Sequence, residues 1–161
     1  MKRGFTLIEL LVVIAIIGIL SSVVLASLSN ARLNARTTRS IQDLHSLRTA
    51  LELYATSNNG NYPVSTGGAG VWDGLYTCWG DSTPDWIAGL APTYIASLPR
   101  SPNNSTACNN NYIYRSDGVD FKIIWHDPEA CTTVQSRYPN LVDPGRTCWA
   151  YGCWTAGGVG F

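Results

Sequence analysis

Apolar residues dominate the chain from Gly4 to Ala31, where Glu9 is the only charged residue. The 22 residues from Leu10 to Ala31 contain neither a charge nor a proline. A bilayer core of roughly 30 Å needs about 20 apolar residues in a helix, so this run predicts a membrane-spanning helix. An acid at the edge of such a run indicates a functional role, because a carboxylate inside a membrane is unfavourable.

The helical pattern continues beyond the apolar run, because residues 32–57 contain neither Gly nor Pro. Apolar residues at steps of three and four form one stripe on this segment: Ile41, Leu44, Leu47, Leu51 and Tyr54. The sequence Asn58-Asn59-Gly60 predicts the end of the helix. A single helix from Phe5 to Ser57 would be roughly 80 Å long at about 1.5 Å per residue.

The remainder of the chain predicts a small sheet. Residues 112–115 and 119–125 form a hairpin pattern around Asp117-Gly118, a favoured tight-turn dipeptide. On the second strand, apolar residues alternate with mostly polar ones and are expected to pack on the helix stripe: Val119, Phe121, Ile123 and Trp125. The sequence therefore predicts an α+β fold, with a long helix against an antiparallel sheet.

Other parts of this region carry weaker patterns. Residues 64–86 are rich in Gly, Ser, Thr and Asp, and residues 86–91 predict one short helical turn. A third strand is expected over residues 147–154, and residues 127–146 form the long connection into it.

Composition divides the chain in the same way. A length of 161 residues suits one globular domain and an anchor. Residues 1–57 hold six Lys or Arg and three acids, a net charge of +3, whereas the remainder holds five basic residues and eight acids, a net charge of −3. All five Cys and all six Trp follow residue 70. The head is thus mildly acidic and rich in Trp.

Cysteine usage suits an exported protein with disulfide bonds. The candidates for disulfide bonds are Cys78, Cys108, Cys131, Cys148 and Cys153. Their connectivity cannot be read from the sequence, although loop geometry favours Cys131 with Cys148 or Cys153. A zinc site is not favoured, because the spacing of Cys148 and Cys153 is not C-x-x-C and His126 is the only His of the head.

The sequence gives little support for enzyme activity or a bound cofactor. His126, Asp127 and Cys131 are the only grouping that resembles a nucleophile and its base, and they are too close in sequence for their side chains to need to converge. Residues 67–70 are Gly-rich but lack the Lys of a phosphate-binding loop. The Trp residues could stack on nucleic acid or sugar, but such surfaces normally have a basic groove. We expect no enzyme activity, cofactor or metal, and a nucleic-acid partner is not favoured.

The segment from Lys2 to Val12, KRGFTLIELLV, closely resembles the leader and N-terminal helix of type IV pilins and type II secretion pseudopilins. The resemblance implies that a dedicated prepilin peptidase cuts between Gly4 and Phe5 and N-methylates Phe5. It also implies that Glu9 serves filament assembly. The amino group of Phe5 and the carboxylate of Glu9 would lie one helical turn apart, so they could pair within one chain or between neighbours.

An ordinary secretory signal peptide is the competing interpretation, with cleavage after Ala26 or Ala31. It is less favoured because the apolar run is long and has an acid at its start. Ala26 stands where many major type IV pilins have a helix-kinking Pro, which leans toward a pseudopilin or a minor pilin. The aromatic, Cys-bearing loops of the head lean instead toward a pilin exposed outside the cell.

The expected organisation is a pilin-like chain with a leader (1–4), a transmembrane and assembly half of the helix (5–31), an amphipathic half (32–57) and a head (58–161). The expected function is a structural subunit of a type IV pilus or pilus-like filament. A type II secretion pseudopilin is the alternative, and a single-pass binding or adhesive domain that does not polymerise is the alternative from another class.

The expected location is the inner membrane, with one membrane pass and the head outside the cytoplasm, and then a cell-surface or periplasmic filament. Charge alone does not decide this orientation, because arginines on the far side of the helix offset Lys2 and Arg3. The expected partners are further copies or related pilins, prepilin peptidase, an inner-membrane assembly platform and lipid.

Overall fold

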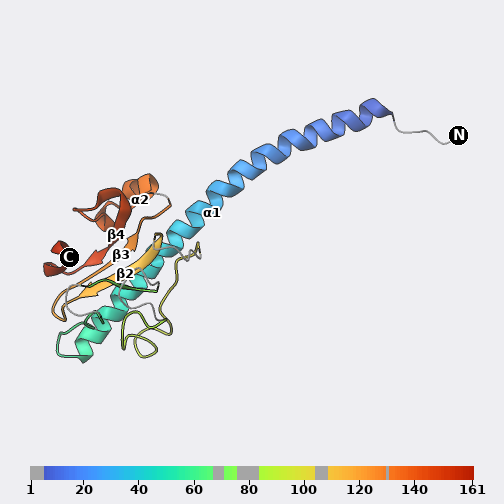
Figure 1. The fold of residues 1–161 in the computed structure, drawn as a ribbon. Helices are drawn as coiled ribbons and strands as arrows, with labels where there is room; N and C mark the ends of the chain where they lie inside the picture. Colours follow the sequence, from blue (N-terminus) through green and yellow to red (C-terminus); the bar gives the residue numbers. More distant parts are fainter. Residues whose placement is uncertain (1–5, 67–70, 76–83, 104–108, 130) are drawn as a thin grey trace. The chain divides into compact units, whose positions relative to one another are not determined.

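The structure, a computed structural model, describes residues 6–66, 71–75, 84–103, 109–129 and 131–161 (Figure 1). The chain forms two compact units, Met1–Ala35 and Arg36–Phe161. Helix α1 (Leu7–Ser57) contributes to both units. The second unit contains the sheet and is called the head below.

Helix α1 ends where the sequence predicts. The residues after Ser57 leave the helical conformation through Asn59 and Gly60, whose φ angles are 57° and 85°. The Ala55 carbonyl accepts hydrogen bonds from the Gly60 amide at 2.8 Å and from the Asn58 amide at 3.1 Å, which gives partners to a carbonyl at the helix end. Asn and Gly tolerate this left-handed backbone better than other residues, which explains why the chain turns at this point.

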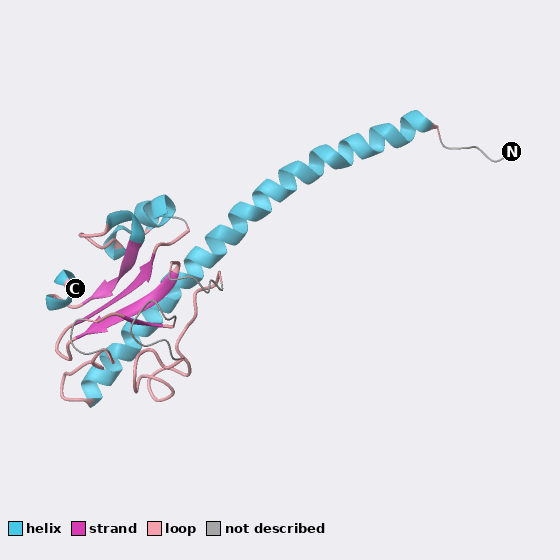
Figure 2. Ribbon diagram, in the orientation of Figure 1, coloured by secondary structure: helices cyan, strands magenta, loops and turns pink. Residues whose placement is uncertain are grey.

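The sheet has four antiparallel strands in the order β1-β2-β3-β4 (Figure 2). The strands are β1 (Asp73–Gly74), β2 (Asn111–Ser116), β3 (Phe121–His126) and β4 (Ala150–Trp154). Register places Ile113 of β2 opposite Ile124 of β3, and Ile124 opposite Gly152 of β4. A long helix against a small antiparallel sheet is the α+β arrangement predicted from the sequence, and this prediction is confirmed.

The core lies between one face of the sheet and the stripe on α1. The buried helix residues are Ile41, Leu44, Leu47, Ala50 and Leu51, and the buried strand residues are Tyr112, Tyr114, Phe121, Ile123, Trp125, Tyr151 and Cys153. The predicted packing of the second hairpin strand on the helix is correct for Phe121, Ile123 and Trp125 of β3. It is wrong for Val119, which lies in the turn before β3 and is 69% exposed.

The opposite face of the sheet buries a charge. The Lys122 side chain has no exposed surface, and its ammonium group lies 2.8 Å from the Asp143 carboxylate. The same ammonium donates to the carbonyl of Val159 at 2.8 Å. Asp143 also accepts from Arg146 and from the Gly145 amide. This network holds the connection before β4 and the C-terminal segment against the sheet.

Several local elements differ from the sequence predictions. Residues 86–91 form turns and no helix. The connection predicted over 127–146 contains helix α2 (Cys131–Arg137) and a 3-10 helix at Pro139–Leu141. Strand β4 starts at Ala150, after a 3-10 turn at Thr147–Trp149. Helix α2 has a single buried residue, Val134, so its seven residues carry no apolar stripe from which a helix could be predicted.

Two leucines on α1 test the role of the stripe. Leu47 has no exposed surface, whereas Leu53 is 51% exposed. We expect Leu47→Ala to lower the free energy of unfolding by about 2–5 kcal/mol, and Leu53→Ala to change it by less than about 0.5 kcal/mol. Denaturant unfolding of the full chain in detergent measures both. Equal losses for the two variants would contradict the assignment of the core.

A second test concerns the buried ion pair. Burial opposes ionisation of Asp143, but hydrogen bonds from Lys122, Gly145 and Arg146 outweigh it and hold the pKa of Asp143 below its usual range. The unfolded chain therefore binds the proton more tightly, with a pKa of about 3.9. This contribution to stability is complete above that pH and is lost as the pH falls through the lower pKa of the folded state.

Asp143→Asn should therefore lower the free energy of unfolding at pH 7 by about 3 kcal/mol and flatten its dependence on pH below about 4. Denaturant unfolding between acidic and neutral pH measures both effects. Asp85→Asn is the control, since Asp85 is exposed and forms no ion pair with another described residue. Parallel pH curves for wild type and Asp143→Asn would count against the network.

Candidate assembly site

The N-terminal part of α1 is an uncovered apolar surface. Every large apolar side chain from Leu7 to Leu28 is exposed, and within the described residues nothing buries this segment. The helix is long and apolar enough to cross a membrane. Soluble monomers rarely expose contiguous apolar patches of more than a few hundred Å². This half of α1 therefore requires lipid or other apolar helices around it.

A capping box begins the helix. Glu9 Oε2 accepts hydrogen bonds from the Thr6 amide at 2.8 Å and from Thr6 Oγ1 at 2.7 Å, and Thr6 Oγ1 accepts from the Glu9 amide at 3.3 Å. These reciprocal bonds provide partners for amides that a helix start leaves unpaired. They also hold a carboxylate at the positive end of the helix dipole. The cap thus fixes where the Glu9 side chain lies.

The cap leaves one carboxylate oxygen of Glu9 available. Both accepted bonds use Oε2, and no described residue donates to Oε1. This oxygen can accept a hydrogen bond from a further cationic group. Gly4 and Phe5, the predicted processing residues, lie outside the described residues, so the pairing of Glu9 with the Phe5 amine stays a prediction. The sequence predictions lack Thr6, although Thr-x-x-Glu before an apolar run is a recognisable capping signature.

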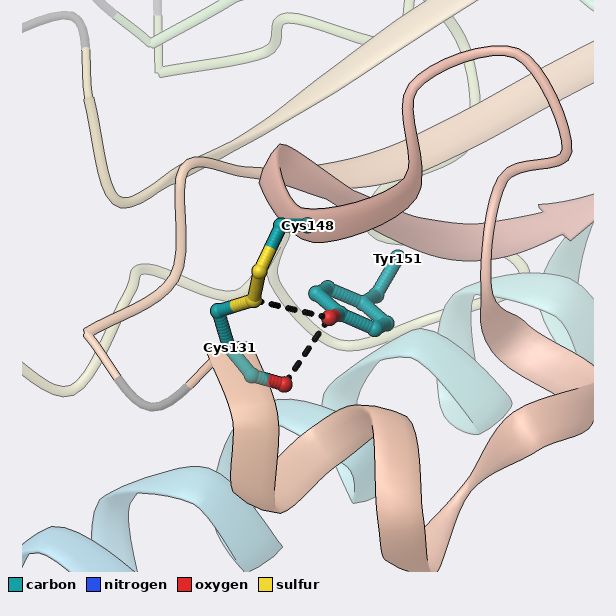
Figure 3. The surroundings of a disulfide bond; sticks show 3 residues. All are labelled: Cys131, Cys148 and Tyr151. Carbon is teal, nitrogen blue, oxygen red and sulfur yellow. Dashed lines mark hydrogen bonds between the residues drawn. A yellow bond between two sulfur atoms is a disulfide. The ribbon is translucent and has the colours of Figure 1, made fainter.

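A disulfide bond between two described cysteines fastens the head (Figure 3). It joins Cys131 at the start of α2 to Cys148, 17 residues later, with Cα atoms 5.3 Å apart. This is one of the two pairings that loop geometry favoured for Cys131. The Tyr151 hydroxyl donates to the Cys131 carbonyl at 2.9 Å, so β4 and the disulfide support the same corner of the head.

The other cysteines separate into two groups. Cys153 is a free thiol buried against α1, with its sulfur 3.9 Å from the Leu44 carbonyl. Burial raises the pKa of Cys153 to about 12, so this thiol is unreactive near neutral pH. Cys78 and Cys108 lie outside the described residues.

Three of the catalytic and stacking candidates, Cys131, Trp86 and Trp125, have structural roles in the head. Cys131 is in a disulfide and cannot serve as a nucleophile, and the His126 ring packs edge-on against Trp149, with ring centres 5.5 Å apart. Trp86 and Trp125 are buried in the core. Among the described residues, no group of three or more His, Cys, Asp or Glu side chains could hold a metal ion.

Comparison with known proteins extends these observations. Residues 1–25 match the family model described as the prokaryotic N-terminal methylation motif. The chain is 40% identical over 101 residues to type II secretion system core protein G of Aeromonas hydrophila, covering 63% of this chain and 67% of the relative. It is 32% identical over 117 residues to the protein of the same name of Vibrio cholerae, covering 73% of each.

A further relative is the type IV major fimbrial protein FimA of Dichelobacter nodosus, 32% identical over 85 residues, which are 52% of this chain and 54% of the relative. Several matches to other proteins named type II secretion system core protein G span less than half of the relative's length. No solved structure matches the chain.

An apolar N-terminal helix with a methylation motif and an α+β head define a pilin-like subunit. The chain belongs to the superfamily of type IV pilins and type II secretion pseudopilins. Members of this superfamily are structural subunits, so the chain is a structural protein rather than an enzyme.

The disulfide leads to a stability prediction. The variant with both Cys131→Ser and Cys148→Ser should lose about 3 kcal/mol of unfolding free energy. The disulfide joins residues 17 positions apart and therefore restricts a loop of the unfolded chain. Gln135→Ser, an exposed change on the same helix, is the matched control and should be nearly neutral. Denaturant unfolding gives both values, and a double variant as stable as the control would contradict the expected contribution.

Proposed function

We propose that the chain is a pseudopilin, a subunit of the filament of a type II secretion system. The observation that carries this proposal is the similarity to core protein G of Aeromonas hydrophila and Vibrio cholerae, matched over about two thirds or more of their length. The sequence alone put the type IV pilus first. The relatives favour the pseudopilin alternative, because the fimbrial relative is matched over a smaller part of its length.

Maturation follows from the N-terminal motif. In this proposal, prepilin peptidase cuts between Gly4 and Phe5 and N-methylates Phe5. Residues 5–31 then anchor the chain in the inner membrane by a single pass, residues 32–57 continue the helix, and residues 58–161 form a head outside the cytoplasm. The exposed apolar half of α1 supports this division.

Assembly exchanges one apolar environment for another. When a subunit leaves the bilayer at the assembly platform, its apolar helix again needs cover, and the same surface of related subunits provides it. A carboxylate costs about 2.5–3.5 kcal/mol near the centre of a membrane helix and less near its end, where Glu9 lies. Pairing Glu9 with the amine of Phe5 on a neighbouring subunit would remove this cost and fix the axial offset between the helices. The Thr6 cap presents Glu9 for that contact.

Glu9→Ala tests the assembly role. We expect the variant to insert in the inner membrane like wild type but to lose sedimentable filaments, because the carboxylate that fixes the offset is gone. Fractionation of cells followed by sedimentation of sheared filaments measures both. Glu52→Ala is the control, since Glu52 is an exposed acid in the head part of α1. Normal filaments from Glu9→Ala would refute the assembly role of Glu9, whereas absence of filaments from the wild-type chain as well would favour a membrane-anchored head that does not polymerise.

The type IV pilus is the second candidate function, supported by the match to the fimbrial protein. Deletion of the gene separates the two. A pseudopilin predicts that exported proteins accumulate in the periplasm while surface pili persist. Loss of surface pili with normal secretion would contradict the pseudopilin proposal and establish the pilus.

A further inference from the structure

The head has a groove with a positively charged rim. It has a volume of about 600 Å³ and lies between α1 and residues 84–100. Its apolar lining includes Leu75, Trp86 and Leu98, while Arg39 and Arg100 stand at its rim. Both arginines are exposed, and neither forms an ion pair with a described carboxylate. Among the described lining residues, one acid, Asp85, accompanies the two arginines, and Arg39 also interacts electrostatically with Asp43 of α1.

The hairpin turn between β2 and β3 has the complementary character. Val119 is 69% exposed and lies between Asp117, which is exposed, and Asp120, which is half-buried. The turn therefore presents one apolar side chain between two acids, one of which, Asp120, also accepts a hydrogen bond from the Gly157 amide of its own chain through Oδ1 at 3.1 Å. Backbone amide bonds hold the pKa of the Asp117 carboxyl below its usual range, so this side chain is ionised at neutral pH.

The turn is already held in one conformation. Asp117 Oδ1 accepts from the amides of Val119 and Asp120, both at 2.9 Å. Gly118 has a φ of 98°, which favours glycine, and its amide donates to Ser116 Oγ at 3.0 Å. A partner that binds this turn therefore does not have to order it first, which removes part of the entropy cost of association.

The groove and the turn lie at opposite ends of β2. Trp86 and Arg100 lie beside Asn111, the first residue of the strand. The turn follows Ser116, its last residue. Six residues of antiparallel strand span roughly 20 Å, so the turn cannot reach the groove of its own head. A second copy of the chain can supply it.

We propose that residues 117–120 of one subunit dock into the groove of a second copy, with Val119 against the apolar lining and the two acids beside Arg39 and Arg100. The inference rests on the proposed function and deepens it by naming a contact between heads. Two different surfaces meet in such a contact, so repetition gives an open filament rather than a closed dimer.

The size of the groove sets the role of this contact. A stable interface buries about 1,200–2,000 Å² in total, which one turn of four residues does not reach. The contact therefore adds to the packing of the α1 helices and does not replace it. Complementary charges at the rim choose the partner surface and its register more than they add affinity.

Cysteine cross-linking of the full chain tests the contact. The variant with both Val119→Cys and Ala96→Cys places a thiol on the turn and one at the groove, where Ala96 is exposed. After mild oxidation of sheared filaments, we expect a ladder of covalent multimers on a non-reducing gel. Either single variant should give none, and the pair Val119→Cys with Gln135→Cys, an exposed position on α2, is the matched control.

Charge exchange at Arg100 provides the second measurement, and Asp117 stays unchanged because it also holds the turn. In the cross-linking background, Arg100→Glu should reduce the ladder several-fold, and Arg100→Lys should keep it, because lysine retains the positive charge. The same two changes without the added cysteines should lower and keep the sedimentable fraction, respectively. A ladder whose intensity does not change with these substitutions, or is no greater than that of the control pair, overturns the docking.

The outcomes separate this inference from the proposed function. Filaments that sediment normally but show no ladder overturn the docking and leave the pseudopilin assignment standing. If the chain without added cysteines forms no filaments and the cysteine variant forms no ladder, both the docking and the proposed function are overturned. A ladder whose intensity follows the charge exchange supports the contact.

Discussion

Within the described residues, nothing covers the apolar half of α1, and the interpretation of the chain as a filament subunit depends on this exposure. The large apolar side chains from Leu7 to Leu28 are exposed, and full burial of each of them would contribute about 1.5–3 kcal/mol. Lipid can provide this burial for a single subunit, and other apolar helices can provide it for many. The start of a helix leaves backbone amides without partners. The capping box of Thr6 and Glu9 pairs two of these amides.

The head obeys the opposite requirement, since it buries its own apolar surface. The stripe on α1 packs against one face of a four-stranded sheet, and the other face encloses the Lys122–Asp143 pair. The disulfide between Cys131 and Cys148 fastens the connection that precedes the last strand. The head thus buries its own apolar surface while the N-terminal half of α1 does not, and this difference is the physical basis of the proposed transfer of a subunit from a membrane into a filament.

Periodic patterns made the main elements predictable. The stripe from Ile41 to Leu51 repeats over several turns, and Phe121, Ile123 and Trp125 recur at every second position of β3, so helix and hairpin could be predicted with their packing faces. Helix α2 has only Val134 buried, and β1 has two residues, so neither carries a pattern. The burial of Lys122 depends on Asp143, and no local pattern in the sequence links these two residues. The capping role of Thr6 could have been predicted, because its signature lies within four consecutive residues.

The central claim is that the mature subunit keeps its apolar helix and begins with a new amino group beside Glu9. Mass spectrometry of the intact chain purified from the membrane tests this claim most directly. The account predicts a chain that starts at N-methylated Phe5 and includes all of α1. A chain that starts at Ser27 or Arg32, as an ordinary signal peptidase would leave it, or one that retains residues 1–4, would contradict it.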